Sequence, residues 1–145
     1  MPRLDAERIE LWRALCRTTA DLQRRIDAEL LDETGLPLPW FEVLAALQQG
    51  NGSLRVKEVC DALDDVPSSL SRRLDRLEDE GYVERASTPQ PDDRRAVTVT
   101  LTAEGRAVWR DANITYRRLV QNEFARTLTD TDLATLHRVL AKLSR

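Results

Sequence analysis

The strongest constraint on the fold is residues 82–102, a segment with the pattern of a β-hairpin. Its two β-type runs are Tyr82–Ser87 and Ala96–Leu101, and in the second run apolar residues alternate with threonines. The residues just before it, Val66–Gly81, have the apolar spacing of a helix. A helix followed at once by a charged hairpin is the arrangement of a winged helix-turn-helix. The segment therefore predicts a DNA-binding module.

The loop of the hairpin carries two prolines, two aspartates and two arginines. Core packing does not explain a pair of arginines at a hairpin tip, whereas a finger that reaches a phosphate-lined groove does. We expect Asp93, Arg94 and Arg95 to be the DNA-binding residues of this wing. The plain alternative is a charged surface turn held by an Asp–Arg pair, and both descriptions can hold together.

The helix before the hairpin has an apolar face and a polar face. Leu70, Leu74 and Leu77 lie at i, i+4 and i+7 and predict the buried face, with Asp65 as the N-cap. Hydroxyls can bond phosphate or base edges, and arginine can fork onto guanine. The predicted DNA contacts of this recognition helix are Ser68, Ser69, Ser71, Arg72, Arg73 and Arg76. A solvated face with salt pairs between successive turns is the alternative.

The remaining chain predicts a mainly α fold of about six helices. Helices are expected over Leu4–Leu31, Pro39–Gln49 and Val56–Leu63, with Leu54 and Arg55 as a short strand. After the hairpin, we expect helices over Thr102–Arg126 and from Thr129 onward, both with a threonine as N-cap.

The helices at the two ends are amphipathic and remote in sequence from the central module. Their apolar stripes would be too exposed in a monomer, so we expect them to pack together and against a second copy. The sequence thus predicts a dimerisation region at residues 1–35 and 103–145 around a DNA-binding module at 36–102.

Composition excludes several classes of protein. The formal net charge of −3 argues mildly against nucleic acid, but a DNA-binding protein needs only a local basic face. The two cysteines lack metal-ligand spacing, so we expect no metal or cofactor. With one histidine and no phosphate loop or nucleophile elbow, the chain is not expected to be an enzyme. No apolar signal or membrane-length run is present, which favours a cytoplasmic location.

The segment VKEVCDALDDVPSSLSRRLDRLEDEGYVERASTPQPDDRRAVTVTLTAEGRAV resembles the MarR (multiple antibiotic resistance regulator) family of bacterial transcription factors. The resemblance implies a homodimer on a pseudo-palindromic operator, most often a repressor, whose recognition helices enter successive major grooves. It also implies that Arg95 enters the minor groove and that Asp93 orients it, with Arg94 as the variable middle residue.

The resemblance further implies a small phenolic or other aromatic effector, bound between the dimerisation region and the DNA-binding module. The candidate lining residues are Trp12, Trp40, Phe41, Trp109 and Tyr116. The alternative is that these aromatics fill the core or the dimer interface. For His137, on the last helix, a packed and hydrogen-bonded role is expected before a ligand-binding one.

Three alternatives to an effector-controlled regulator stay open. One is a redox-responsive regulator that senses through Cys16, as some relatives do, although this chain lacks tyrosines in its first two helices. Another is a winged-helix regulator with no effector. The third is a protein-interaction module that binds no DNA. Cys60 is expected to be a small core residue.

Overall fold

The structure is a computed structural model that describes residues 5–88 and 96–144. Within this part of the chain, α-helices predominate and one small antiparallel sheet is present. In chain order the elements are α1 (Ala6–Thr34), α2 (Leu38–Gln49), β1 (Ser53–Arg55), α3 (Val56–Leu63), α4 (Pro67–Asp79), β2 (Val83–Thr88), β3 (Ala96–Leu101), α5 (Ala103–Val120), the π-helix η1 (Gln121–Ala125) and α6 (Asp130–Leu143). The mainly α winged-helix fold predicted from the sequence is confirmed.

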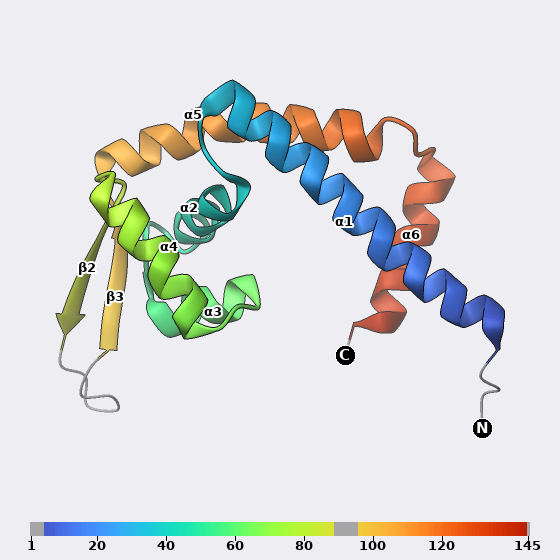
Figure 1. Ribbon diagram of the computed structural model, residues 1–145, viewed down its shortest axis with the longest axis horizontal. Coiled ribbons are helices and arrows are strands. Elements are labelled where there is room, and N and C mark those ends of the chain that lie inside the picture. The colour runs from blue at the N-terminus through green and yellow to red at the C-terminus, as the bar shows by residue number, and fades with distance from the viewer. Residues whose placement is uncertain (1–4, 89–95, 145) are drawn as a thin grey trace.

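The chain has a compact group of helices and strands and a long helix, α1, that extends away from this group (Figure 1). Figure 1 shows α2, α3, α4 and the strands gathered at one end, while α1 extends from them toward the N-terminus. Helix α5 spans the region between this group and α1 and contacts both α1 and α2. The long helices therefore carry the compact helix–sheet group at one end.

Local signals define the ends of α1. The Asp5 side chain accepts a hydrogen bond from the backbone N–H of Arg8 (2.7 Å), which caps the start. The helix continues past the predicted end at Leu31 to Thr34. It ends there because Gly35 adopts a left-handed conformation (φ +73°) and donates its N–H to the Leu31 carbonyl (2.8 Å).

The hairpin forms two strands of the three-stranded sheet, whose order is β1-β3-β2. Its central strand pairs antiparallel with both neighbours, so that Val99 lies opposite Leu54 on one side and Arg85 on the other. Val99 is fully buried, and Leu101, two residues further along on the same face, is also buried in the core. The alternation seen in the sequence therefore does put one face of this strand on the core.

The start of α4 differs from the prediction. The N-cap residue is Val66, not Asp65, and Pro67 takes the first helical position. The Asp65 carboxylate instead accepts from the N–H of Val66 (2.8 Å) and forms an ion pair with Arg73. The Asp65 carboxylate is thus engaged by an arginine of α4 itself and not by the backbone of the first helical turn.

The helix after the hairpin ends close to the predicted Arg126, but its last turn is not α-helical: α5 ends at Val120 and continues directly as the π-helix η1. The wider π-type turn closes with a hydrogen bond from the Arg126 N–H to the Gln121 carbonyl (2.8 Å). Within this turn Glu123 pairs with Arg25 of α1 (3.0 Å). The turn thus presents a carboxylate to the neighbouring long helix.

The core lies where α2 meets α4, the sheet and the inner ends of α1 and α5. Leu30 brings α1 into this core and Leu119 brings α5 into it, and both are fully buried. The other fully buried leucine and valine side chains are Val43, Leu44, Leu47, Val59, Leu70, Leu74, Leu77, Val83 and Val99. Leu70, Leu74 and Leu77 are thus confirmed as the inner face of α4.

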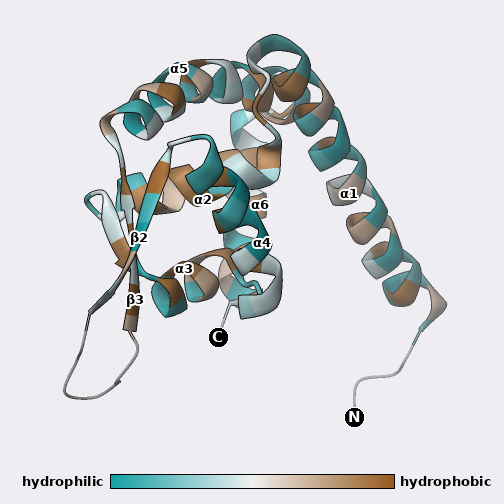
Figure 2. Ribbon diagram, turned by 60° about the vertical axis from the view of Figure 1, so that its left-hand side comes forward, coloured by the Kyte–Doolittle hydropathy of each residue, from teal (hydrophilic) through white to brown (hydrophobic). Residues whose placement is uncertain are grey.

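The predicted packing of the end helices on one another is present in part within one chain, because α1 packs on α5 and η1 whereas α6 stays uncovered. All of α6 is described, and it buries no side chain. Helix α1 buries only Ile26 and Leu30. Figure 2 shows apolar patches along the part of α1 that stands clear of the other elements. The apolar stripes of both helices therefore face solvent in the single chain.

Candidate nucleic-acid interface

The N-terminal half of α4 presents a polar, exposed face. Pro67 starts the helix, and Leu70 and Leu74 hold it on the core. The exposed side chains are those of Ser68, Ser69, Ser71, Arg72 and Arg76, five of the six predicted contacts of the recognition helix. Small hydroxyls at a helix N-terminus allow close approach to a phosphate-lined groove, and arginines add the charge.

Arg73 is placed differently from the other five. Its guanidinium forms an ion pair with Asp65 and donates to the Pro39 carbonyl (3.1 Å). The side chains of Arg73 and Asp65 are 20% and 16% exposed. Arg73 therefore ties α4 to the start of α2, and its donors are engaged inside the protein.

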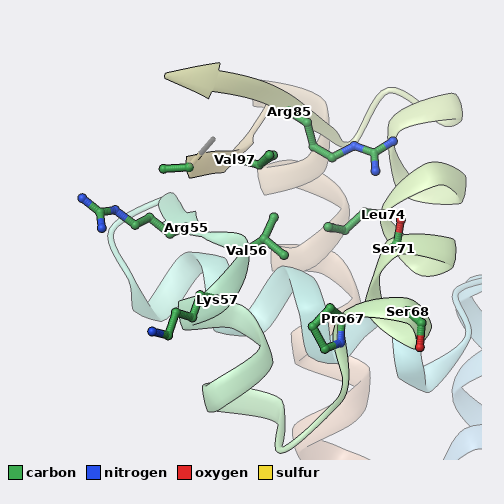
Figure 3. Close-up of a pocket in the computed structure, with 10 residues that line it drawn as sticks. Arg55, Val56, Lys57, Pro67, Ser68, Ser71, Leu74, Arg85 and Val97 are labelled. Carbon is green, nitrogen blue, oxygen red and sulfur yellow. The ribbon is translucent and has the colours of Figure 1, made fainter. Parts of the chain in front are cut away.

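A groove of about 830 Å³ opens between the start of α3, the N-terminal half of α4 and the strands. Figure 3 shows its lining, with Lys57 on one side and Ser68 and Ser71 on the other. Arg55, Val56, Pro67, Leu74, Arg85, Ala96 and Val97 complete it. The groove thus brings hydroxyls and cationic side chains from four elements, β1, α3, α4 and β2, to one surface.

Sequence reasoning missed three cationic residues of this groove, Arg55, Lys57 and Arg85. The sequence did contain a signal for two of them. Arg55 and Lys57 flank the first residue of α3, and the start of a helix that precedes the recognition helix lies on the same surface as the start of the recognition helix. No comparable signal existed for Arg85, whose place depends on how β2 packs against α4.

Arg85 joins β2 to α4 through two carboxylates. Its Nη2 lies 2.5 Å from Asp75 Oδ1 and 2.7 Å from Glu78 Oε2, and its Nε donates to the same Glu78 oxygen (2.8 Å). Hydrogen bonds to Asp75 and then to Glu78 raise the pKa of the Arg85 guanidinium. The acidic part of α4 is therefore partly neutralised by the strand beside it.

The wing residues Asp93, Arg94 and Arg95 lie outside the described residues. The last described pair of the hairpin is Thr88 opposite Ala96, at the ends of β2 and β3. In Figure 1 these strand ends lie on the same side of the molecule as α3. The predicted role of the three residues stays a prediction.

The structure brings together three of the five aromatic candidates for an effector site. Phe41 and Tyr116 lie with their ring centroids 4.5 Å apart, and with Trp109 they line a cavity of about 370 Å³ between α2 and α5. The amides of Gln48 and Asn113 also line it.

Two polar atoms beside this cavity are buried without a hydrogen-bond partner among the described residues, Gln48 Oε1 and Trp109 Nε1. A buried acceptor and a buried donor left unpaired are costly unless something else pairs with them. Burial, and then the nearby charge of Glu42, raises the pKa of Tyr116, so its hydroxyl stays protonated.

The other two aromatic candidates lie elsewhere. Trp12 is 63% exposed on the outer part of α1. Trp40 lines a separate cavity of about 290 Å³ with Leu36, Tyr82 and Val108. The five aromatics thus do not form one site within the single chain.

Two further sequence expectations can be compared with the structure. Cys60 is buried in α3, as expected, and Cys16 is exposed on α1, and neither forms a disulfide. His137 is exposed on α6 in the single chain, so the expected packing around it is not present there. Among the described residues, no helix is long and apolar enough to cross a membrane.

Comparison with known proteins points to one family. A family model described as "MarR family" matches residues 34–96. The multiple antibiotic resistance protein MarR of Salmonella typhimurium is 32% identical over 103 residues, which cover 71% of this chain and 69% of that protein. The transcriptional repressor MdtR of Bacillus subtilis is 27% identical over 117 residues, which cover 81% of this chain and 73% of that protein.

A solved structure extends this similarity to nearly the whole chain. The crystal structure of a mutant MarR from Escherichia coli complexed with operator DNA matches with a TM-score of 0.81 and 29% identity. The match covers 99% of this chain and 100% of that one.

Proposed function

Because the chain belongs to the MarR family of transcriptional regulators, which are not enzymes, we propose that it binds a specific operator as a homodimer and represses transcription. The observation that carries this proposal is the exposed face of α4, with Ser68, Ser69, Ser71, Arg72 and Arg76, beside a groove lined by cationic side chains. Cationic side chains and hydroxyls can bind the phosphates of DNA, and the serines and arginines can also bind base edges in the major groove. We place the protein in the cytoplasm, where it reaches DNA.

The acidic end of α4 supports one orientation on DNA. Asp79 and Glu80 are exposed at the C-terminal end of the helix, and the hydroxyl residues lie at its N-terminal end. The N-terminus also carries the positive end of the helix dipole. We therefore propose that the N-terminal end of α4 enters the major groove and that the wing arginine Arg95 follows the minor groove beside it.

Capture of genomic fragments tests this function. The protein is incubated with sheared DNA of its own genome, and the retained fragments are sequenced and then titrated as short duplexes. We expect a shared, near-palindromic sequence and a logarithm of affinity that falls steeply with the logarithm of salt concentration. A protein that retains no fragment, or whose binding ignores salt, is not an operator-binding regulator.

The exposed stripes of the end helices support the homodimer. Leu11, Trp12 and Leu15 of α1 and Leu140 and Leu143 of α6 are all exposed in the single chain. Apolar residues at such density on two helices indicate an interface. A two-fold dimer would also present two copies of α4, as a near-palindromic operator requires.

We further propose that a small aromatic effector binds in the cavity between α2 and α5. Phe41, Trp109 and Tyr116 supply ring faces, and the unpaired Gln48 Oε1 and Trp109 Nε1 supply one acceptor and one donor. A planar ring that carries both a donor and an acceptor, such as a phenol, satisfies these groups. A cavity of about 370 Å³ is large enough for one substituted ring.

Fluorescence titration with phenol tests the effector site. We expect phenol to quench the wild-type protein and the Trp12→Phe variant, and to weaken their binding to the operator. The Trp109→Phe variant keeps an aromatic face, on a smaller ring, and loses the N–H donor, so we expect it to bind phenol about tenfold more weakly. Equal binding by all three proteins would place the ligand elsewhere, and no binding would favour a regulator without this class of effector.

A further inference from the structure

We propose that Arg85 is a positioning residue that holds the wing at a fixed angle to the recognition helix. It acts by fastening β2 to Asp75 and Glu78 of α4, and these three residues are called the α4–β2 clamp below. The proposal rests on the DNA-binding function proposed above and adds a requirement to it. An operator must be met by helix and wing together, so their relative angle has to be set before binding.

The clamp lies just beyond the last core contact of β2. Val83 is 1% exposed and packs in the core, and Arg85 is two residues further along the strand, on the same face. The turn before this strand contains Gly81 in a left-handed conformation (φ +81°). A hairpin anchored only at Val83 could pivot about this turn, whereas a second attachment further along the strand prevents it.

The chemistry of the clamp fits a planar fork. Asp75 and Glu78 are three residues apart on α4, so their side chains lie on adjacent turns of one face. The guanidinium of Arg85 reaches both carboxylates, and its side chain is 25% exposed. A lysine ammonium keeps the charge but cannot reproduce the two-sided geometry.

The direction of Arg85 separates positioning from direct DNA contact. Figure 3 shows the side chain extending from its strand toward α4, while Lys57 lies on the other side of the groove. Its Nε and Nη2 are both engaged by carboxylate oxygens. We therefore expect Arg85 to act on DNA through the placement of β2 and not through a phosphate.

Neutralising the carboxylates tests the clamp, because positioning and simple repulsion predict opposite changes in DNA affinity. The double variant Asp75→Asn/Glu78→Gln removes two negative charges from the DNA-binding module and disrupts the clamp. The matched control is Asp79→Asn/Glu80→Gln, which removes two exposed charges from the C-terminal end of the same helix and leaves the clamp intact. Each protein is titrated with the duplex that the wild-type protein retains most strongly and with a scrambled duplex of the same length.

We expect the double variant to bind the retained duplex about five- to tenfold more weakly and the scrambled duplex no more weakly than the wild type does. Asp79→Asn/Glu80→Gln should bind both duplexes as tightly as the wild type or slightly more tightly. Arg85→Lys, which keeps the charge, should lose discrimination as the double variant does. Arg85→Met, which removes the charge, should leave the salt slope unchanged, since no phosphate contact is removed. Circular dichroism and the thermal midpoint must show that each variant is folded at the titration temperature.

Three results would overturn the clamp. Tighter binding of both duplexes by the double variant would mean that the carboxylates only repel DNA. A salt slope lower by about one in Arg85→Met would make Arg85 a phosphate contact. A loss of affinity that only follows a lowered fraction of folded protein would make it a stability residue. If the wild-type protein binds no duplex, the proposed function fails first and the clamp fails with it.

Discussion

Arg72 and Arg73 are neighbours with the same chemistry and different surroundings. Arg72 is exposed on α4, and Arg73 lies one position further around the helix, where it meets Asp65 and the Pro39 carbonyl. A step of about 100° per residue is enough to turn one arginine to solvent and the other to the protein. Substitution of Arg72 is therefore expected to affect DNA binding, and substitution of Arg73 to affect stability.

Arg72→Ala should weaken DNA binding and leave stability unchanged. We expect a loss of about 1–3 kcal/mol in the free energy of binding to the retained operator and a smaller loss on random DNA. An exposed arginine that makes no core contact should change the free energy of unfolding by less than about 0.5 kcal/mol. Equal losses on operator and random DNA would make Arg72 a phosphate contact only.

Arg73→Ala should lower stability. The substitution removes an ion pair and a hydrogen bond to a backbone carbonyl, and it leaves the partly buried Asp65 carboxylate without this partner. We expect the free energy of unfolding in urea to fall by about 1–3 kcal/mol, and Asp65→Ala to have a similar effect. Unchanged stability together with weaker DNA binding would show that Arg73 contacts DNA, as the sequence predicted.

The junction between the hairpin and α5 shows how two elements are held in close contact. Thr102 caps α5 by accepting from the Gly105 N–H (2.9 Å), and its hydroxyl donates to the Gly81 carbonyl (2.6 Å). A Cβ atom at Gly105 would lie 2.0 Å from the Tyr82 carbonyl oxygen. The early glycine in this helix is thus required by the approach of a backbone and not by a turn.

Gly105→Ala should therefore be destabilising although alanine favours helices. The new methyl group has to push the Tyr82 backbone away from the first turn of α5, which we expect to cost about 2 kcal/mol or more. Ala107→Ser, at an exposed position of the same helix, should cost only about 0.5 kcal/mol. Urea unfolding followed by circular dichroism measures both, and a stabilised Gly105→Ala protein would show that the junction is loosely packed.

The outer parts of α1 and α6 carry exposed apolar side chains that a second copy of the chain would cover. Helix α1 is covered only at its inner end, where Ile26 and Leu30 are buried, and α6 buries none of its side chains. Their exposure is explained if a second copy covers them. The two modules of a dimer would then be spaced by long helices that are rigid along their length.

Leu140→Glu in α6 should convert the dimer to a monomer and leave the module folded. Leu140 is 52% exposed in the single chain, so its replacement removes no contact within the chain's own core, while a carboxylate in a dimer interface is costly. Sedimentation should show half the mass of the wild-type particle. Thr131→Glu, which adds the same charge on the opposite face of α6, should keep the wild-type mass, and a dimeric Leu140→Glu would place the interface elsewhere.

Loss of the dimer should also weaken operator binding. A single module can contact only half of a near-palindromic site, so the Leu140→Glu protein should bind one half-site and the whole operator with nearly the same affinity. The wild-type dimer should prefer the whole operator strongly. Titration with both duplexes separates this effect from loss of folding.

The features that the sequence predicted correctly are those that depend on nearby residues. The apolar spacing of Leu70, Leu74 and Leu77, the threonine caps at Thr102 and Thr129, and the alternation of the last strand each follow from a few neighbouring side chains. Helices and hairpins are formed by such local interactions, so their type and approximate ends could be read from the chain.

The features that were missed depend on partners far away in the chain. Arg73 is held by Pro39, which precedes it by 34 residues, and Gly105 is required by the carbonyl of Tyr82 on the other side of the hairpin. Arg85 finds its carboxylates only because β2 packs beside α4. A residue's type sets what it can bind, but the packing of distant elements sets what lies within its reach.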